Sequence, residues 1–296
     1  MKEVVVISGK GGVGKSSITA ALASLLLTEK QRIVLADTDV DAPNLNLVLG
    51  ARLDTSEEIA ASAKAFIDPD KCMACMACMD VCRFSAIIGT DHPIIVNYAC
   101  EGCGACGLVC PEEAISIHEV VNGRLNTMRA GNMLLVAGAL MVGASSSGRL
   151  VDMVKKRARR EAEQCRADLI LTDGPPGIGC PVIAAIKGAD YVVLITEPTP
   201  AALHDLRRVI DVVRHFMTPL GLVINRADLH APSQRTIRDF ALANDYALLG
   251  TIPSDQNMTR ALEQGRSVVV AYPETPAALA LRAVAGALAA HLTALP

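Results

Sequence analysis

The stretch from Glu3 to Ser17 reads EVVVISGKGGVGKSS, and it decides the fold. Its apolar, β-branched start, Glu3–Ile7, predicts a buried strand, and the glycines that follow predict a loop that opens a helix. The spacing of Gly9, four further residues and then Gly14-Lys15-Ser16 is that of a phosphate-binding loop. Glycines let the backbone wrap around phosphate oxygens, so that N–H groups and the helix N-terminus face the anion.

We therefore expect this loop to bind the phosphates of ATP. Lys15 would reach the β- and γ-phosphates, and the Ser16 hydroxyl would bind Mg²⁺. A glycine-rich turn without a ligand is the alternative, but the strand–loop–helix context favours the phosphate site. The predicted cofactor-binding residues of the loop are Gly9, Lys10, Gly11, Gly12, Val13, Gly14, Lys15, Ser16 and Ser17.

Strand and helix patterns alternate along most of the chain. Helix-length stretches such as Gly148–Cys165 and Ala201–Phe216 have apolar residues at three- and four-residue spacing. With strands apolar on both faces, this alternation predicts an α/β fold in which helices cover a mostly parallel sheet. Asn132–Val142 is a further candidate strand. The remaining short apolar runs are Glu3–Ile7, Arg32–Ala36, Leu169–Thr172, Tyr191–Thr196, Leu220–Asn225 and Ala247–Ile252.

Residues 56–125 break this alternation because they repeat themselves. An internal two-fold repeat between two strand–helix units indicates an inserted domain. We predict a P-loop ATPase domain at residues 1–55 and 126–296, and a small inserted α+β, ferredoxin-like domain at residues 56–125. The repeat is carried by Cys72, Cys75, Cys78 and Cys82, which recur 28 residues later as Cys100, Cys103, Cys106 and Cys110.

Each cysteine set has the form C-x₂-C-x₂-C-x₃-C, the run of bacterial ferredoxins, in which the fourth cysteine ligates the other cluster. Eight thiolates at these spacings predict two 4Fe–4S clusters. A zinc site is the alternative, but it needs separate C-x₂-C pairs, which these triples do not resemble. The first cluster is assigned to Cys72, Cys75, Cys78 and Cys110, and the second to Cys100, Cys103, Cys106 and Cys82.

One residue departs from the ferredoxin pattern, and two cysteines lie outside it. Pro111 follows the second run as expected, whereas Arg83 occupies the matching place in the first. A positive charge there would change the potential of a cluster more than its assembly, unless Arg83 simply faces solvent. Of the two other cysteines, we expect Cys165 to be a core or boundary thiol and Cys180 a buried thiol near the nucleotide.

Carboxylates follow two of the predicted strands. Asp173 ends a buried strand beside the loop, where it can hold Mg²⁺ through water. Asp37, Asp39 and Asp41 project from the end of the second strand. We assign to Asp39 the role of orienting the attacking water, with Asp37 and Asp41 near the metal. Any one of the three could instead be a solvated loop carboxylate.

The loop contains a second lysine, Lys10, and its KGGVGK form resembles the deviant Walker A ATPases, the family of MinD, ParA, Mrp and the nitrogenase iron protein. The resemblance continues along the host domain. ADTDVDAPNLNLVLG, Ala36–Gly50, resembles the first switch of the family, and LILTDGPPGIG, Leu169–Gly179, resembles its Walker B strand and second switch. VINR, Val223–Arg226, and IPSD, Ile252–Asp255, resemble the segments that frame adenine.

The resemblance implies that Lys10 crosses a dimer interface to the partner's nucleotide, so that ATP closes a homodimer and hydrolysis loosens it. The predicted catalytic residues are therefore Lys10, Lys15, Asp37 and Asp39. Further cofactor contacts are implied for Asp41, Asp173, Gly174, Pro175, Asn225, Arg226, Pro253 and Asp255. For Asn225 and Asp255, the alternative to contacting the adenine is an ordinary role as turn and cap residues. A cluster shared between subunits is not expected, because Val142–Arg149 offers Cys180 no second cysteine.

These sites together predict a slow, partner-stimulated ATPase. Its nucleotide state would control electron transfer, or docking, to an unidentified redox or metalloprotein partner. Contacts of the γ-phosphate to the switch loops would supply the required difference in affinity between two states. An assembly factor for iron–sulfur clusters or metalloproteins, recognised by labile clusters, is one alternative. A positioning ATPase like MinD or ParA is the other.

The composition limits where the protein is located and which ligands it binds. The sequence has 296 residues, 51% hydrophobic and 20% charged, without a membrane-length apolar run or an export signal, so we expect a cytoplasmic protein that binds no membrane. Ten cysteines in that compartment favour metal ligation over disulfides. The net charge of −3 gives no case for binding nucleic acid.

Local charge is uneven. Between Asp54 and Arg124 there are 11 acidic and 4 basic residues. The basic run Lys155–Arg160 is either a solvated helix face or a docking surface for an acidic partner or for this acidic segment. We expect the last helix, Pro276–Leu295, to pack in the core.

Overall fold

The computed structural model describes residues 1–27, 32–144 and 148–295. Within these ranges, one nine-stranded sheet has the order β13-β12-β11-β1-β10-β2-β9-β8-β3. The strands from β13 to β9 are parallel to their neighbours, and β8 and β3 are antiparallel at one edge. The parallel strands are β1 (Lys2–Ser8), β2 (Ile33–Asp37), β9 (Met133–Leu140), β10 (Leu169–Pro176), β11 (Tyr191–Thr196), β12 (Leu220–Ile224) and β13 (Ala247–Thr251).

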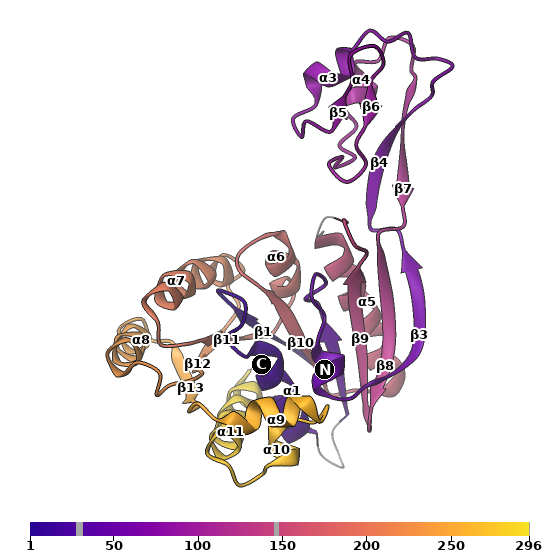
Figure 1. Cartoon of the computed structure of the whole chain (residues 1–296). Helices are drawn as coiled ribbons and strands as arrows, with labels where there is room; N and C mark the ends of the chain where they lie inside the picture. Colours follow the sequence, from indigo (N-terminus) through magenta and orange to yellow (C-terminus); the bar gives the residue numbers. More distant parts are fainter. Residues whose placement is uncertain (28–31, 145–147, 296) are drawn as a thin grey trace.

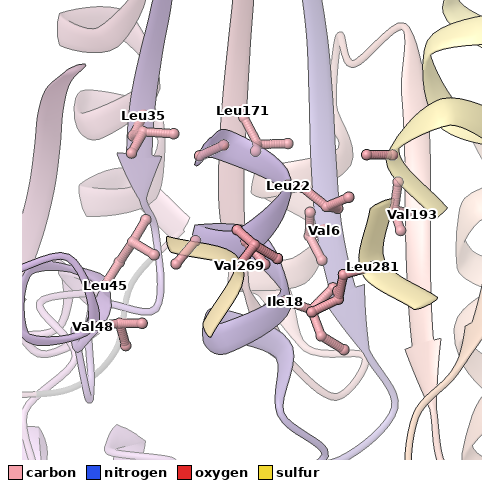
Figure 2. Close-up of a cluster of buried hydrophobic side chains, with 14 of the residues drawn as sticks. Val6, Ile18, Leu22, Leu35, Leu45, Val48, Leu171, Val193, Val269 and Leu281 are labelled. Carbon is pink, nitrogen blue, oxygen red and sulfur yellow. The ribbon is translucent and has the colours of Figure 1, made fainter. Parts of the chain in front are cut away.

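Helices cover both faces of this sheet. Alternate residues of a strand point to opposite faces, so strands that are apolar throughout give the sheet two apolar faces to cover. In β1, Val6 belongs to one hydrophobic cluster and Val5 to the other. Figure 2 shows the first cluster, in which Ile18 and Leu22 pack beside Val6. This face is covered by α1 (Lys15–Leu26), α2 (Leu45–Val48), α9 (Gln256–Glu263), α10 (Val268–Ala271) and α11 (Pro276–Ala294). The other face is covered by α5 (Gly148–Cys165), α6 (Cys180–Ile186), α7 (Pro200–His215) and α8 (Ala231–Ala243).

The predicted mostly parallel α/β sheet is therefore confirmed, and each predicted strand matches an observed one within two residues at both ends, except that β10 extends four residues beyond the predicted Thr172. The predicted helix Gly148–Cys165 coincides with α5. Among the described residues, α11 alone is long and apolar enough to cross a membrane by length and composition. It contacts α1 and β13, and its residues Leu281, Val284 and Leu288 are fully buried, as expected of a core helix.

The cysteine-rich region forms a separate lobe at the end of a two-stranded ribbon (Figure 1). The base of the ribbon is β3 (Arg52–Ile59) and β8 (Gly123–Ala130), which belong to the main sheet. The ribbon continues outward as the antiparallel pair β4 (Ser62–Ile67) and β7 (Ile115–Val120). The lobe adds α3 (Ala77–Val81), β5 (Ile87–Ile88), β6 (Ile94–Ile95) and α4 (Ala105–Leu108).

The boundaries predicted for the inserted domain, residues 56 and 125, fall inside β3 and β8. These two strands pair with each other and extend the host sheet, so the chain leaves the sheet several residues later than the repeat suggests. The predicted host ranges also include residues 28–31, 145–147 and 296, which lie outside the described residues.

The basic run on α5 is largely used inside the molecule. Lys155 is buried and pairs with the carboxylate of Glu3 at 2.9 Å, and Arg159 pairs with the same group at 2.7 Å. Arg157 donates to both carboxylate oxygens of Glu57, on β3, at 2.8 and 2.7 Å. The sequence offered two interpretations of this run, a solvated helix face and a docking surface. Arg157 docks against the acidic segment of its own chain, whereas Lys155 is buried and is part of no outer surface.

Replacing Glu3 by Gln should cost much of the stability of the host domain. Burial lowers the pKa of Lys155, and the nearby Glu3 carboxylate opposes that effect, so removing the carboxylate leaves a buried cation without a counterion. We expect a loss of about 3 kcal/mol in the free energy of unfolding, measured by urea denaturation. Glu58→Gln is the control, because Glu58 and Arg124 are both exposed. It should cost less than about 1 kcal/mol. Equal losses in the two variants would contradict this account.

Candidate functional site

The glycine-rich loop joins β1 to α1 in a conformation that its glycines make possible. Gly12 and Gly14 have φ angles of 79° and 90°, in the left-handed region that favours glycine. A Cβ atom at Gly14 would lie 2.5 Å from Nδ2 of Asn225. That Nδ2 donates to the carbonyl of Val13 at 2.7 Å, so the residue after β12 holds the loop from the side.

Lys15 and Asp173 form a buried ion pair at the base of the loop. Nζ of Lys15 lies 2.9 Å from Oδ1 of Asp173, and the two side chains are 7% and 0% exposed. Burial lowers the pKa of Lys15, but the nearby carboxylates of Asp173, Asp39 and Asp37 together outweigh it, so the pKa is raised and the amine stays charged. Nζ has three N–H groups, and its carboxylate neighbours Asp173 and Asp39 lie at 2.9 and 3.7 Å, so a proton remains that an anion can accept.

Asp173 also connects α1 to the strand end of β2. Ser16 and Thr19 donate to its two carboxylate oxygens at 2.5 and 2.8 Å. The backbone N–H and the hydroxyl of Thr38 both donate to its carbonyl oxygen at 2.9 Å. Thr19 and Thr38 are not among the residues predicted from the sequence. Their only sequence signal is position, one helical turn after Lys15 and directly after β2.

Asp37 holds the segment that follows β2. Its carboxylate is fully buried and accepts backbone N–H groups from Asp39, Asn44 and Leu45 at 3.2, 3.1 and 3.0 Å. Burial, together with the nearby charge of Asp173, raises the pKa of Asp37 to about 8. Its oxygens are therefore committed to the backbone of the segment that follows β2.

The three predicted switch carboxylates thus lie in different surroundings. Asp39 lines the cavity beside the loop, and its Oδ2 is 3.7 Å from Nζ of Lys15. Burial raises the pKa of Asp39, and Lys15 opposes the rise. Asp41 is exposed and does not line that cavity. Asp39 is therefore the one of the three that faces the space where a γ-phosphate would lie.

Two adjoining cavities follow the loop. One, of about 290 Å³, is lined by most of the loop from Gly11 to Ser17, by Asp39 and by Pro176. The other, of about 560 Å³, is lined by Asn225, Arg226, Pro253 and Asp255, and the two share Gly14, Ser17 and Leu262. Most of the predicted phosphate and adenine residues thus lie along one cleft, whereas Gly9, Lys10 and Val13 line neither cavity.

Several predicted residues have structural roles, and two of them, Gly174 and Pro175, line neither cavity. Gly174 and Pro175 are buried within β10, and a Cβ at Gly174 would lie 2.6 Å from Cγ2 of Ile7. The Asp255 side chain caps α9 by accepting the N–H of Asn257 at 2.8 Å. Asn225 holds the loop, as described above. The cap alternative therefore describes Asp255, whereas the Asn225 side chain makes a long-range contact to the loop that neither alternative foresaw.

The second lysine of the loop pairs within its own chain. Nζ of Lys10 lies 2.7 Å from Oε1 of Glu197, which is buried just after β11. Arg226 holds the other oxygen of Glu197 at 3.1 Å. Glu197 is absent from the sequence prediction, although a carboxylate directly after the run Tyr191–Thr196 is a signal that could have identified it.

The eight cysteines of the lobe divide between two small cavities. Each cavity contains the first three cysteines of one run and the fourth of the other, which is the crossed grouping predicted from the spacing. Across the described residues, no three His, Cys, Asp or Glu side chains are grouped closely enough to hold one metal ion. One cavity is lined by Cys72, Cys75, Cys78 and Cys110, and the other by Cys82, Cys100, Cys103 and Cys106.

Both cysteine runs have the same local conformation. The residues at matching places in the two runs, Ala74 with Gly102 and Met76 with Gly104, all have positive φ angles. In each run, the fourth cysteine accepts a backbone N–H at its Sγ at 3.3 Å, from Ala86 or from Ala114. The same left-handed backbone at matching places, strained at Ala74 and Met76 and free of strain at the two glycines, indicates that each run is shaped around its cavity.

The remaining sulfur and charge positions are exposed or peripheral. Arg83 is exposed. Cys165 is half-buried at the end of α5, as expected for a boundary thiol. The expectation of a buried Cys180 is wrong, because this thiol is exposed at the start of α6. The turn before α6 presents the first helical residue to solvent rather than to the sheet.

Comparisons with known proteins agree with this geometry. The model of the family described as "CobQ/CobB/MinD/ParA nucleotide binding domain" matches residues 4–268. An uncharacterized protein of Methanocaldococcus jannaschii is 38% identical over 229 residues, 77% of this chain and 79% of that protein. The "Iron-sulfur cluster carrier protein" of Deinococcus radiodurans is 28% identical over 304 residues, 99% of this chain and 71% of that protein.

Solved structures show the same fold. The septum site-determining protein MinD of Pyrococcus horikoshii, complexed with Mg-ADP, aligns with a TM-score of 0.61 and 20% identity. The alignment covers 99% of this chain and 98% of that one.

The buried Asp37 should give the nucleotide-free protein a distinctive pH dependence. Because its pKa is higher in the folded state than the ordinary 3.8, the folded state binds the proton more tightly than the unfolded state. The free energy of unfolding should therefore fall as the pH rises from 3.8 to about 8. Asp37→Asn, which stays neutral, should flatten this slope in denaturant titrations at several pH values. The exposed Asp41→Asn should keep it, and an unchanged slope in Asp37→Asn would refute the assignment.

Proposed function

Because the chain belongs to the CobQ/CobB/MinD/ParA nucleotide-binding family, we propose that it is an ATP-hydrolysing switch protein whose lobe holds two 4Fe–4S clusters. The observation that carries the proposal is the division of eight cysteines over two cavities, on a ribbon continuous with the sheet that holds the phosphate loop. Nucleotide state would control electron delivery, or docking, to a redox or metalloprotein partner.

The cleft beside the loop fits a magnesium nucleotide. The charged Nζ of Lys15 borders the cavity and has three N–H groups, so it can bind a phosphate oxygen while it stays close to Asp173. Gly11 and Gly12 face open space, so phosphate oxygens can approach the backbone without a Cβ in the way. Ser16 and Asp173 would hold Mg²⁺, directly and through water, and Asp39 would orient the attacking water.

The cysteine cavities fit iron–sulfur clusters better than single ions. Four thiolates that share one zinc ion must lie within about 4 Å of one another, whereas thiolates around a cubane are farther apart. Burial raises the pKa of the Cys78 and Cys106 thiols, so their thiolates need a compensating positive charge such as that of iron. Each cluster would accept or donate one electron when bound. The residues 56–125 would thus act as a ferredoxin-like domain.

A nucleotide-dependent homodimer is part of the proposal. Lys10 lies at the mouth of the loop, 35% exposed, and its partner Glu197 holds it away from the cleft of its own chain. A lysine that does not line its own nucleotide cleft can contact the nucleotide of a second copy once it leaves Glu197. ATP would then favour the closed pair, and hydrolysis would release it.

A cluster carrier or assembly factor is the second candidate. It is favoured by the similarity over 99% of the chain to a protein named as an iron–sulfur cluster carrier. The two candidates differ in the stability of the clusters, because a carrier must release clusters to an acceptor protein and an electron carrier must keep them.

A positioning ATPase like MinD has only the shared fold in its favour. Because α11 packs one face into the core and Lys155 and Arg157 are paired internally, we expect neither membrane nor nucleic acid as partner, and a cytoplasmic location suits reduced cysteines.

Iron analysis of cysteine variants tests both the clusters and their crossed ligands. Anaerobically purified protein should contain about eight iron atoms per chain, and Cys110→Ser should retain about four. Adding Cys72→Ser to Cys110→Ser should remove no more iron, because both residues line one cavity. Adding Cys100→Ser should remove the remainder. Cys165→Ser is the control and should keep the full content.

The opposite pattern of double variants would show that each run holds its own cluster. Zinc in place of iron would overturn the iron–sulfur assignment altogether. Transfer of iron and sulfide from the loaded protein to an apo-ferredoxin, faster with ATP than without it, would favour the carrier over the electron-transfer function.

A further inference from the structure

Asn122 joins the strands at the point where the ribbon leaves the host sheet. It lies between β7 and β8 and is 5% exposed. Its backbone N–H donates to the carbonyl of Ile59 at 3.1 Å, and its side-chain Oδ1 accepts the N–H of Ala61 at 2.7 Å. Its carbonyl accepts the N–H of Met141 at 2.9 Å. One side chain and its peptide group therefore connect the ribbon to the end of β9.

The same end of β9 is bonded to the switch segment. The N–H of Leu140, the residue before Met141, donates to the carbonyl of Val40 at 2.9 Å. Val40 follows Asp39, whose carboxylate is 3.7 Å from Nζ of Lys15. A continuous series of hydrogen bonds and peptide units thus runs from the phosphate cavity to Asn122.

Side-chain packing follows the same route. Val40 is 1% exposed and lies over Gly138 of β9, where a Cβ would come within 2.8 Å of its Cγ1. Leu150 of α5 borders Gly138 as well, and it lies 3.0 Å from the place a Cβ would take at Gly123. Val40, Leu150 and Ala61 belong to one hydrophobic cluster. A shift of Val40 therefore meets packed neighbours on its way to the ribbon and cannot be absorbed in empty space.

The ribbon in turn touches the cysteine cavities. The N–H of Ala65, on β4, donates to Sγ of Cys100 at 3.4 Å, and the buried Lys64 donates to the carbonyl of Cys100. On the facing strand β7, Ile115 lines the cavity of the first cysteine set. Because both strands contact the cysteine sets, the position of the ribbon sets the position of both cavities.

We propose that Asn122 is a positioning residue that couples the switch segment Thr38–Val40 to the cysteine lobe. A nucleotide that moves Asp39 would move Val40 and the end of β9, and Asn122 would pass the shift to Ile59 and Ala61. The inference rests on the proposed function, because it requires nucleotide binding at Lys15. By linkage, any ligand or partner that holds the lobe in one position changes nucleotide affinity by the same factor.

The present arrangement of Asn122 leaves room for a second one. Its Nδ2 is buried and finds no acceptor in the described part of the chain. A buried amide without an acceptor destabilises the conformation that contains it, so the cost of moving this residue is lowered.

Hydrogen exchange of the cluster-loaded protein tests the coupling. Exchange would be followed at residues 9–17 and at the ribbon, residues 59–67 and 115–122, with MgADP and with Mg and a non-hydrolysable ATP analogue. In the wild type, exchange at residues 9–17 should be slower with the analogue than with MgADP. Exchange of the ribbon should differ by about fivefold between the two nucleotides. Asn122→Ala should keep the first effect and lose the second. Asn126→Ala, in the adjoining strand β8, should keep both.

Asn122→Asp separates coupling from simple loss of structure. It retains the oxygen that accepts from Ala61, so it should keep the ribbon response even where Asn122→Ala loosens the ribbon in both nucleotide states. A ribbon response that survives Asn122→Ala, or is lost in Asn122→Asp, overturns the role of Asn122. Protection of residues 9–17 without any ribbon response in the wild type overturns the coupling and leaves nucleotide binding intact. No protection at residues 9–17 overturns both.

Discussion

The buried ion pair between Lys15 and Asp173 is the interaction on which the rest of the structure depends. Asp173 stands at the carboxyl end of β10, between β1 and β2, so its carboxylate meets the start of α1 and its carbonyl meets Thr38. A buried carboxylate is stable there because Lys15 and two hydroxyl groups compensate it. Phosphate oxygens and Mg²⁺ would compete for the same partners. The pair is therefore both the anchor of the loop and the group that a nucleotide would rearrange.

A second constraint comes from the ribbon. A small lobe with few buried side chains, mainly cysteines, isoleucines and alanines, cannot supply a large hydrophobic core of its own. Bound clusters would contribute that stability, as metals do in other small domains. Its attachment through β3 and β8 to the host sheet fixes where it stands relative to the nucleotide cleft. Through this attachment, the phosphate loop and the cysteine repeat are connected by one continuous sheet and ribbon.

Much of this arrangement is visible in the sequence because the motifs are local. The loop spacing, the strands that alternate with helices and the cysteine repeat all depend on neighbours within a few residues. β3 was not predicted, because RLDTSEEI, Arg52–Ile59, is exposed along almost its whole length and has no apolar face to detect. Glu197, Lys155 and Asn122 depend on partners far away in the sequence. No local pattern distinguishes Lys155 and Asn122 from ordinary surface positions, and Glu197 has only its place directly after a buried strand as a signal.

The account stands on the claim that the nucleotide cleft and the cysteine lobe act as one unit. The most direct measurement is the reduction potential and paramagnetic spectrum of the clusters in the anaerobic protein, with MgADP and with Mg and a non-hydrolysable ATP analogue. The account predicts a difference between the two nucleotide states, because contacts to Asp39 and the switch segment reach the ribbon. Identical potentials and spectra, at saturating concentrations of both nucleotides, would contradict it.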